Sequence, residues 1–123
     1  MSKVVHYEIP VDDPERAQRF YSKVFGWEFE NWGGEGGYWL TPGGVEEEPG
    51  VGGALISRSD LHRAPVVIVG VESVEAALQE AESAGAEVVH PKTSIPGVGY
   101  SGYLRDPEGN VVGVFEPDDS ASV

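Results

Sequence analysis

The sequence predicts an α+β fold in which two βαβββ modules form a curved, cup-like mixed sheet with helices on its outer face. The first observation is a repeat, because the stretch Val4–Phe29 returns about sixty residues later as Val66–Val89, with Val11 aligned on Val71. The second observation is that both copies contain a strand pattern followed by a capped amphipathic helix. Two similar copies in a short chain predict a fold built twice from one unit.

Length and composition agree with one folded domain. The chain has 123 residues, 40% of them hydrophobic, which is enough to bury a core. A unit that occurs only twice is too rare for a solenoid and favours a pseudo-symmetric domain. We therefore expect a single domain over residues 1–123, with repeats at 3–57 and 64–117.

The first strand is predicted at Val4–Val11. Alternation along a strand places His6 and Glu8 on one face. The opposite face carries the residues expected beneath a helix, Val5, Tyr7 and Ile9.

A helix is predicted over Asp13–Phe25. Asp13 is a favourable N-cap, and Pro14 suits the first helical position because its missing N–H would have no partner there. Residues spaced for one helical face form an apolar stripe: Ala17, Phe20, Tyr21 and Val24. We expect this stripe to pack on the apolar face of the first strand, and Gly26 to end the helix.

The remaining elements repeat this order. A second helix is predicted over Ser73–Ala84, with Ser73 as its N-cap. A segment rich in proline and glycine, Pro91–Gly99, is predicted to be a loop that gates the cup. A glycine-rich turn is expected at 33–36. Further strands are predicted at Trp27–Asn31, Gly37–Thr41, Gly53–Ser57, Pro65–Val71, Glu87–His90, Tyr100–Arg105 and Val111–Glu116.

Charge and composition exclude several classes of function. The chain has no cysteine, which excludes disulfides, thiolate nucleophiles and cysteine-based zinc sites. A net charge of −13 with scattered basic residues argues against nucleic-acid binding. No apolar run near the start is long enough for a signal peptide or a membrane span, so we expect no membrane partner and a cytoplasmic location.

Three motifs spread over most of the chain carry a family resemblance. They are His6 with Val11-Asp12-Asp13, the helix end Arg19-Phe20-Tyr21 with Phe25-Gly26-Trp27, and the turn Asp106-Pro107-Glu108-Gly109-Asn110. With them the sequence resembles the vicinal-oxygen-chelate superfamily of glyoxalase I, bleomycin-resistance proteins and extradiol dioxygenases. Within it, the chain looks most like small proteins related to lactoylglutathione lyase.

The resemblance implies a divalent metal held by His, Glu or Gln at four positions, two in each half. His6 stands at the first-strand position, but the equivalent Val66 and the last-strand position Gly113 have no donor atoms in their side chains. The strand Gly53–Ser57 also contains no His, Glu or Gln. We therefore expect no metal ligands and no cofactor, with a divalent metal as the alternative. His62 offers another donor if the register shifts, but we expect it to cap the linker.

His6 and Glu8 are the candidates for ligand binding and for acid–base catalysis. They share one strand face, and an imidazole beside a carboxylate can transfer protons. The alternative is a polar pair that only satisfies itself in a wet cavity. Aromatic residues are predicted to line the cup, with a core role as their alternative, and His90 is expected at the rim. The aromatic candidates are Tyr38, Trp39, Tyr100, Tyr103 and Phe115.

These observations favour a small-molecule binding protein of the glyoxalase/bleomycin-resistance type that lacks the usual metal site. The alternative is a lactoylglutathione-lyase-like or dioxygenase-like enzyme that uses His6 and Glu8, with or without a divalent metal. The expected partners are a small-molecule ligand or substrate and a second copy of the chain, since half-open sheets leave edges that can pair in a homodimer.

Overall fold

The computed structural model describes residues 2–32, 37–44 and 48–122, so the glycine-rich turn expected at 33–36 lies outside the described residues. The chain forms two compact units, and each is described by itself. The N-terminal unit covers residues 6–66, and the C-terminal unit covers 67–123 together with 1–5. Each unit contains four strands and one helix in the order βαβββ, which confirms the predicted α+β class.

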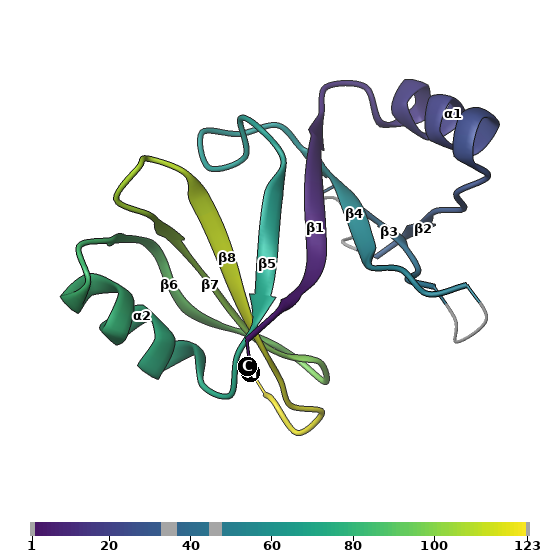
Figure 1. Ribbon diagram of the computed structural model, residues 1–123. Coiled ribbons are helices and arrows are strands. Elements are labelled where there is room, and N and C mark those ends of the chain that lie inside the picture. Colours follow the sequence, from purple (N-terminus) through teal and green to yellow (C-terminus); the bar gives the residue numbers. More distant parts are fainter. Residues whose placement is uncertain (1, 33–36, 45–47, 123) are drawn as a thin grey trace. The chain divides into compact units, whose positions relative to one another are not determined.

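The sheet of the N-terminal unit has the strand order β2-β3-β4-β1 (Figure 1). Strands β1 and β4 are parallel, whereas β3 pairs antiparallel with both β4 and β2. The strand expected at Trp27–Asn31 is shorter than predicted, because only its last two residues pair with β3. The four strands are β1 (Val4–Val11), β2 (Glu30–Asn31), β3 (Tyr38–Thr41) and β4 (Gly52–Ser57).

Helix α1 (Pro14–Phe25) begins and ends where the sequence predicts. The Asp13 carboxylate accepts a hydrogen bond from the Arg16 N–H at 3.1 Å, and Gly26 ends the helix with a φ of 72°. Both signals are local, so they act whatever the helix packs against.

The packing of α1 differs from the prediction. The stripe expected to be buried is largely exposed: Phe20 is 55% and Val24 is 54% accessible. The aromatic rings after the helix connect it to the sheet instead, since Trp27 stacks on Tyr21 with centroids 5.1 Å apart and lies 6.0 Å from Tyr7. The amphipathic pattern predicts the helix but does not decide how much of its apolar face this unit covers.

The C-terminal unit has the strand order β5-β8-β7-β6, with α2 (Val74–Ser83) packed along one face of the sheet (Figure 1). Val74 and Leu78 of the helix form its core with Val114 of β8. The Ser73 hydroxyl and the Glu116 carboxylate both accept N–H groups of the first helical turn. The strands are β5 (Val66–Gly70), β6 (Glu87–Ile95), β7 (Gly99–Arg105) and β8 (Val111–Pro117).

The predicted loop Pro91–Gly99 is mostly strand, which corrects the expectation of a jointed gate. Strand β6 extends from Glu87 to Ile95 and pairs only with β7 at the edge of this sheet. An edge strand tolerates Pro91 because its missing N–H is not needed for a second neighbour. Two register shifts beside His90 accommodate the irregular stretch.

Within the part of the chain that the structure describes, the two helices are too short and too polar to cross a membrane.

Candidate functional site

The candidate site lies on the face of the N-terminal sheet that points away from α1. The register pairs Glu8 with Ala54 and Tyr38 with Ile56, and paired residues in a sheet point to the same side. His6 and Glu8 therefore share this face with Tyr38 of β3. We refer to it as the helix-free face of the N-terminal unit.

The imidazole of His6 and the phenol of Tyr38 share a hydrogen bond, with Nε2 and the hydroxyl oxygen 2.8 Å apart. Both side chains are half-buried, so a molecule lying on this face can reach them. Burial lowers the pKa of His6 below its ordinary value of 6.5, and the nearby charge of Glu8 opposes that shift by raising it. His6 is therefore a neutral imidazole at pH 7 and can either donate or accept a hydrogen bond.

We expect the lowered pKa of His6 to make the free energy of unfolding depend on pH. As the pH falls through the unfolded value of about 6.5 towards the lower folded value, the unfolded chain takes up the His6 proton first, so stability is lost. Denaturant titrations between pH 7.5 and 5 should therefore show a larger loss for the wild type than for His6→Gln. Equal slopes for the two proteins would contradict this assignment.

A second polar contact on the same face is more deeply buried. Nε2 of His62 lies 2.6 Å from Oε1 of Glu8, and both side chains are only 5% exposed. His62 was expected to cap the linker, and that expectation is wrong. The buried carboxylate of Glu8 needs a hydrogen-bond donor, and the imidazole of His62 can supply one.

The linker that carries His62 is fixed by Arg58. The Arg58 N–H donates to the carbonyl of Val11, its Nε to Asp12 at 3.0 Å, and its Nη1 to the carbonyl of Arg63 at 3.0 Å. The His62 N–H also donates to the Ser59 hydroxyl. Together these contacts fold residues 58–63 back over the end of β1, and this turns His62 towards Glu8.

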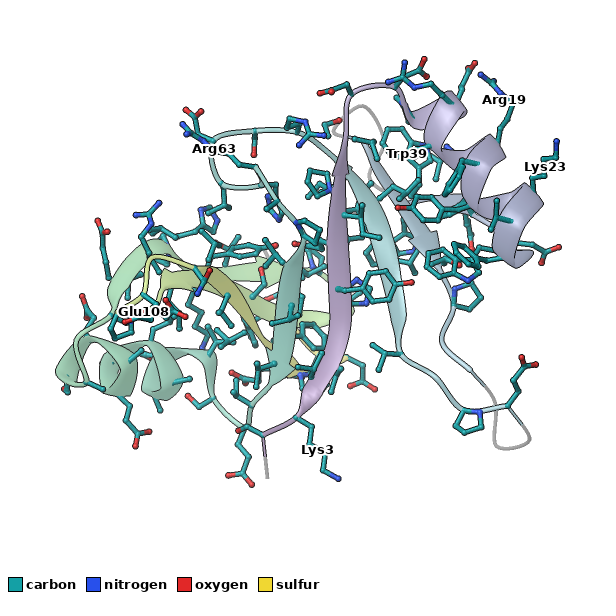
Figure 2. All side chains as sticks on the ribbon, turned by 45° about the horizontal axis from the view of Figure 1, so that its top comes forward. Lys3, Arg19, Lys23, Trp39, Arg63 and Glu108 are labelled. Carbon is teal, nitrogen blue, oxygen red and sulfur yellow. The ribbon has the colours of Figure 1, made fainter. Side chains whose placement is uncertain are left out.

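The other candidates named from the sequence fall on different faces. Trp39 alternates with Tyr38 and lies on the side of the strands where α1 runs (Figure 2). Tyr100 packs against the core under α2. Tyr103 and Phe115 lie on the side of the C-terminal sheet that faces away from α2, and the His90 ring is 6.1 Å from that of Tyr103. The structure thus groups His6 and Glu8 with Tyr38 and His62, and places Trp39 and Tyr100 away from the faces expected to line a cup.

Tyr38 was predicted as one of the aromatic residues of the cup but not as a partner of His6, and His62 was expected to cap the linker. Alternation along β3 gives two opposite faces, but only the pairing with β4 shows that Tyr38 rather than Trp39 lies with His6. The sequence signal for His62 was its position four residues before Val66. That spacing alone does not show that His62 reaches Glu8, because the contact depends on the path of the linker.

The residues present do not fit the four-ligand metal site that the family resemblance implies. Gly113 has no donor, and a Cβ there would overlap Ile68 and approach the Tyr103 ring. Val66 is buried and apolar, and Ala54 stands opposite Glu8 on β4. Among the described residues, no three His, Asp or Glu side chains gather closely enough to hold a metal ion.

Comparison with known proteins identifies the family. The model of the Glyoxalase/Bleomycin resistance protein/Dioxygenase superfamily matches residues 3–114, which is most of the chain. A comparison with curated proteins finds no match.

Several solved structures share this fold at low sequence identity. A hypothetical protein from Bacillus halodurans is 18% identical, with a TM-score of 0.68 over 99% of each chain. A methylmalonyl-CoA epimerase in complex with methylmalonyl-CoA and NH4+ is 15% identical, with a TM-score of 0.68 over 100% of this chain and 99% of that one. The epimerase from Mycobacterium tuberculosis is 17% identical, with a TM-score of 0.63 over 92% and 86%. At these identities the likeness establishes the fold.

Proposed function

We propose, for a chain that belongs to the Glyoxalase/Bleomycin resistance protein/Dioxygenase superfamily, that it binds a small molecule on the helix-free face of its N-terminal unit without a divalent metal. The observation that carries this proposal is the hydrogen bond between His6 and Tyr38, at 2.8 Å, on a face that no helix of its unit covers. Binding sites commonly combine an apolar surface with a few such polar groups.

The chemistry of this pair favours a ligand with carbonyl or hydroxyl groups. A neutral imidazole and a phenol can each donate or accept one hydrogen bond, and neither presents a fixed charge. On the neighbouring strand of the same face, Ala54 is fully buried, but Gly52 and the apolar side chain of Ile56 are partly exposed and offer a surface for the body of a ligand.

Related structures support a small organic ligand. A methylmalonyl-CoA epimerase of this fold has been solved with methylmalonyl-CoA, and the Streptomyces coelicolor epimerase with 2-nitronate-propionyl-CoA. The donor atoms that a metal would need are missing here at Val66 and Gly113, so hydrogen bonds would hold the ligand instead.

Replacing His6 by alanine should weaken ligand binding by about 0.5–3 kcal/mol, the range for one hydrogen bond, and leave the fold intact. A thermal-shift screen of metabolites, antibiotics and methylmalonyl-CoA on EDTA-dialysed protein would supply the ligand, and calorimetry would then compare the variants. Tyr38→Phe should behave like His6→Ala, whereas His90→Ala, exposed on β6, is the matched control. An affinity that ignores both substitutions, or that needs an added divalent ion, would overturn the proposal.

A second candidate function is proton transfer by Glu8 and His62. The 2.6 Å contact between their side chains, beside His6, is the observation that favours it, because a buried carboxylate held by an imidazole can act as a general base. The substrate would carry an acidic C–H next to a carbonyl. Solvent deuterium exchange into methylmalonyl-CoA, followed by NMR, tests this function. Exchange that occurs in the wild type and is lost in Glu8→Gln would show that the chain is an enzyme and would overturn the binding proposal.

A further inference from the structure

The C-terminal unit contains a groove of about 820 Å³ beside helix α2. It is formed by the start of the chain, the end of β5, the first turns of α2 and the end of β8. Every residue that lines it belongs to this one compact unit, and none belongs to the helix-free face of the N-terminal unit. Pockets for small organic ligands usually measure ~300–1,000 Å³, so the groove has room for one such molecule.

The middle of the groove is apolar. Val71 and Phe115 are half-buried there, and Val5 at the start of the chain is 47% exposed. Ala76 and Ala77 supply the wall on the side of α2, and their short side chains leave space beside the helix. Apolar surface that is gathered in a concavity and open to water is typical of a binding site. The body of a matching ligand is therefore apolar.

Two carboxylates lie at separate points along this apolar strip. Glu72 precedes Ser73, the N-cap of α2, and Glu80 lies about two helical turns, ~10 Å, further along the helix. Both glutamates line the groove and both are exposed. Among the described residues, neither of them takes part in an ion pair. Each carboxylate is thus available to a positively charged group of a ligand.

The groove contains little positive charge of its own. Lys3 is the one basic residue among the described residues that line it, and Figure 2 shows its side chain extending away from the strands. No described carboxylate pairs with its amine. Helix α2 carries no lysine or arginine, and the whole chain has a net charge of −13. The charge of the groove therefore favours a cation.

The positive end of α2 does not reverse this preference. The Glu116 carboxylate accepts the N–H of Val74 at 3.0 Å. The Ser73 hydroxyl accepts the N–H of Ala76 at 3.1 Å. These contacts occupy two of the N–H groups that would otherwise attract an anion to the N-terminus of a helix. Glu116 also places a negative charge there, and Glu75 in the first turn adds another.

From these observations we propose that the groove is a second binding site of the chain and takes a small amphipathic amine, a molecule with an apolar body and a protonated nitrogen at one end. The body lies against Val71, Phe115 and the alanines of α2, and binding removes this apolar surface from water. The ammonium group pairs with Glu72 or Glu80. An exposed ion pair alone is weak, so the affinity requires both parts of the ligand.

Three probes that share one apolar body test the charge preference: phenylbutylamine, phenylbutanol and phenylbutyrate. They are titrated into isotope-labelled full-length protein at ~0.15 M salt, where distant charges are screened beyond about 8 Å. We expect the amine to shift the amide NMR signals of Ala76 and Ala77 and to bind about tenfold or more tightly than the carboxylate. Butylamine, which lacks the ring, should bind about tenfold or more weakly than phenylbutylamine, because it buries less apolar surface.

A pair of charge variants assigns the cation preference to the groove. Glu72→Gln/Glu80→Gln should weaken binding of phenylbutylamine about tenfold and leave the affinity for phenylbutanol unchanged. Glu82→Gln/Glu108→Gln is the matched control, because it removes the same charge from two exposed residues outside the groove and should bind the amine like the wild type (Figure 2). His6→Ala should also bind the amine like the wild type, which separates this site from the one on the N-terminal unit.

Four results would overturn the proposal. The first is the absence of signal shifts at Ala76 and Ala77 with millimolar phenylbutylamine. The second is phenylbutyrate binding as tightly as the amine. The third is a control variant that loses as much affinity for the amine as the groove variant, since the preference would then reflect only the net charge of the chain. The fourth is a loss of amine binding in His6→Ala.

Discussion

Replacing His62 by alanine is expected to lower the free energy of unfolding by about 3 kcal/mol, the upper end of the cost of removing one partner from a buried hydrogen bond. The Glu8 carboxylate is only 5% exposed and lies 2.6 Å from Nε2 of His62, so water cannot readily replace the lost imidazole. Denaturant titrations at pH 7, with m-values to check that unfolding remains two-state, measure this loss.

Two matched variants separate this effect from a general loss of side-chain contacts. Arg63→Ala breaks an ion pair with Asp60 whose side chains are 77% and 100% exposed, and it should cost no more than about 1 kcal/mol. The double variant Glu8→Leu/His62→Leu removes both polar groups and should recover much of the loss, because neither partner of the buried hydrogen bond remains. A cost for His62→Ala as small as that of Arg63→Ala would show that the contact contributes little to stability.

Gly53→Val is expected to destabilise the protein by about 3 kcal/mol, at the upper end of the usual cost of overpacking. A Cβ at this position of β4 would overlap the ring of Tyr7, which lies over the glycine. The ring has little freedom to move, because Trp27 contacts it at 6.0 Å and is itself stacked on Tyr21 of α1. The larger side chain must therefore displace the aromatic contacts that join α1 to the sheet.

A graded series tests this explanation. Gly53→Ala should cost less than Gly53→Val, about 1–2 kcal/mol, since it adds a single methyl group to the same overlap. Gly50→Ala is the control, because a Cβ there meets its nearest neighbour only at 3.8 Å. Tryptophan fluorescence should shift in the Gly53 variants as the environment of Trp27 changes. Equal stability of Gly53→Val and Gly50→Ala would exclude the proposed packing of Tyr7.

Much of the fold follows from local signals in the sequence. Asp13, Pro14 and Gly26 define α1 through interactions within a few residues of each other, and the structure reproduces them. The turn after β7 is another case, since the Asp106 carboxylate accepts the N–H groups of Glu108 and Asn110 at 2.9 Å. Where an irregular segment meets a sheet edge, as at Pro91, such signals fail because pairing with β7 outweighs them.

Half of the candidate site was also predictable from the sequence. Strand alternation has a fixed period of two, so Tyr7 on the helix side requires His6 and Glu8 to point the other way. The same rule gives Tyr38 and Trp39 opposite faces, but it cannot tell which face of β3 joins the face of His6.

The two βαβββ units, their capped helices and the orientation of His6 and Glu8 thus follow from residues that are neighbours in the chain. The side chains that meet His6 and Glu8 come from distant parts of the chain. Tyr38 is 32 residues from His6, and His62 is 54 residues from Glu8. Their contacts depend on the register of β3 against β4 and on the path of the linker held by Arg58. Register and path are fixed by long-range pairing, which a periodic local pattern does not encode.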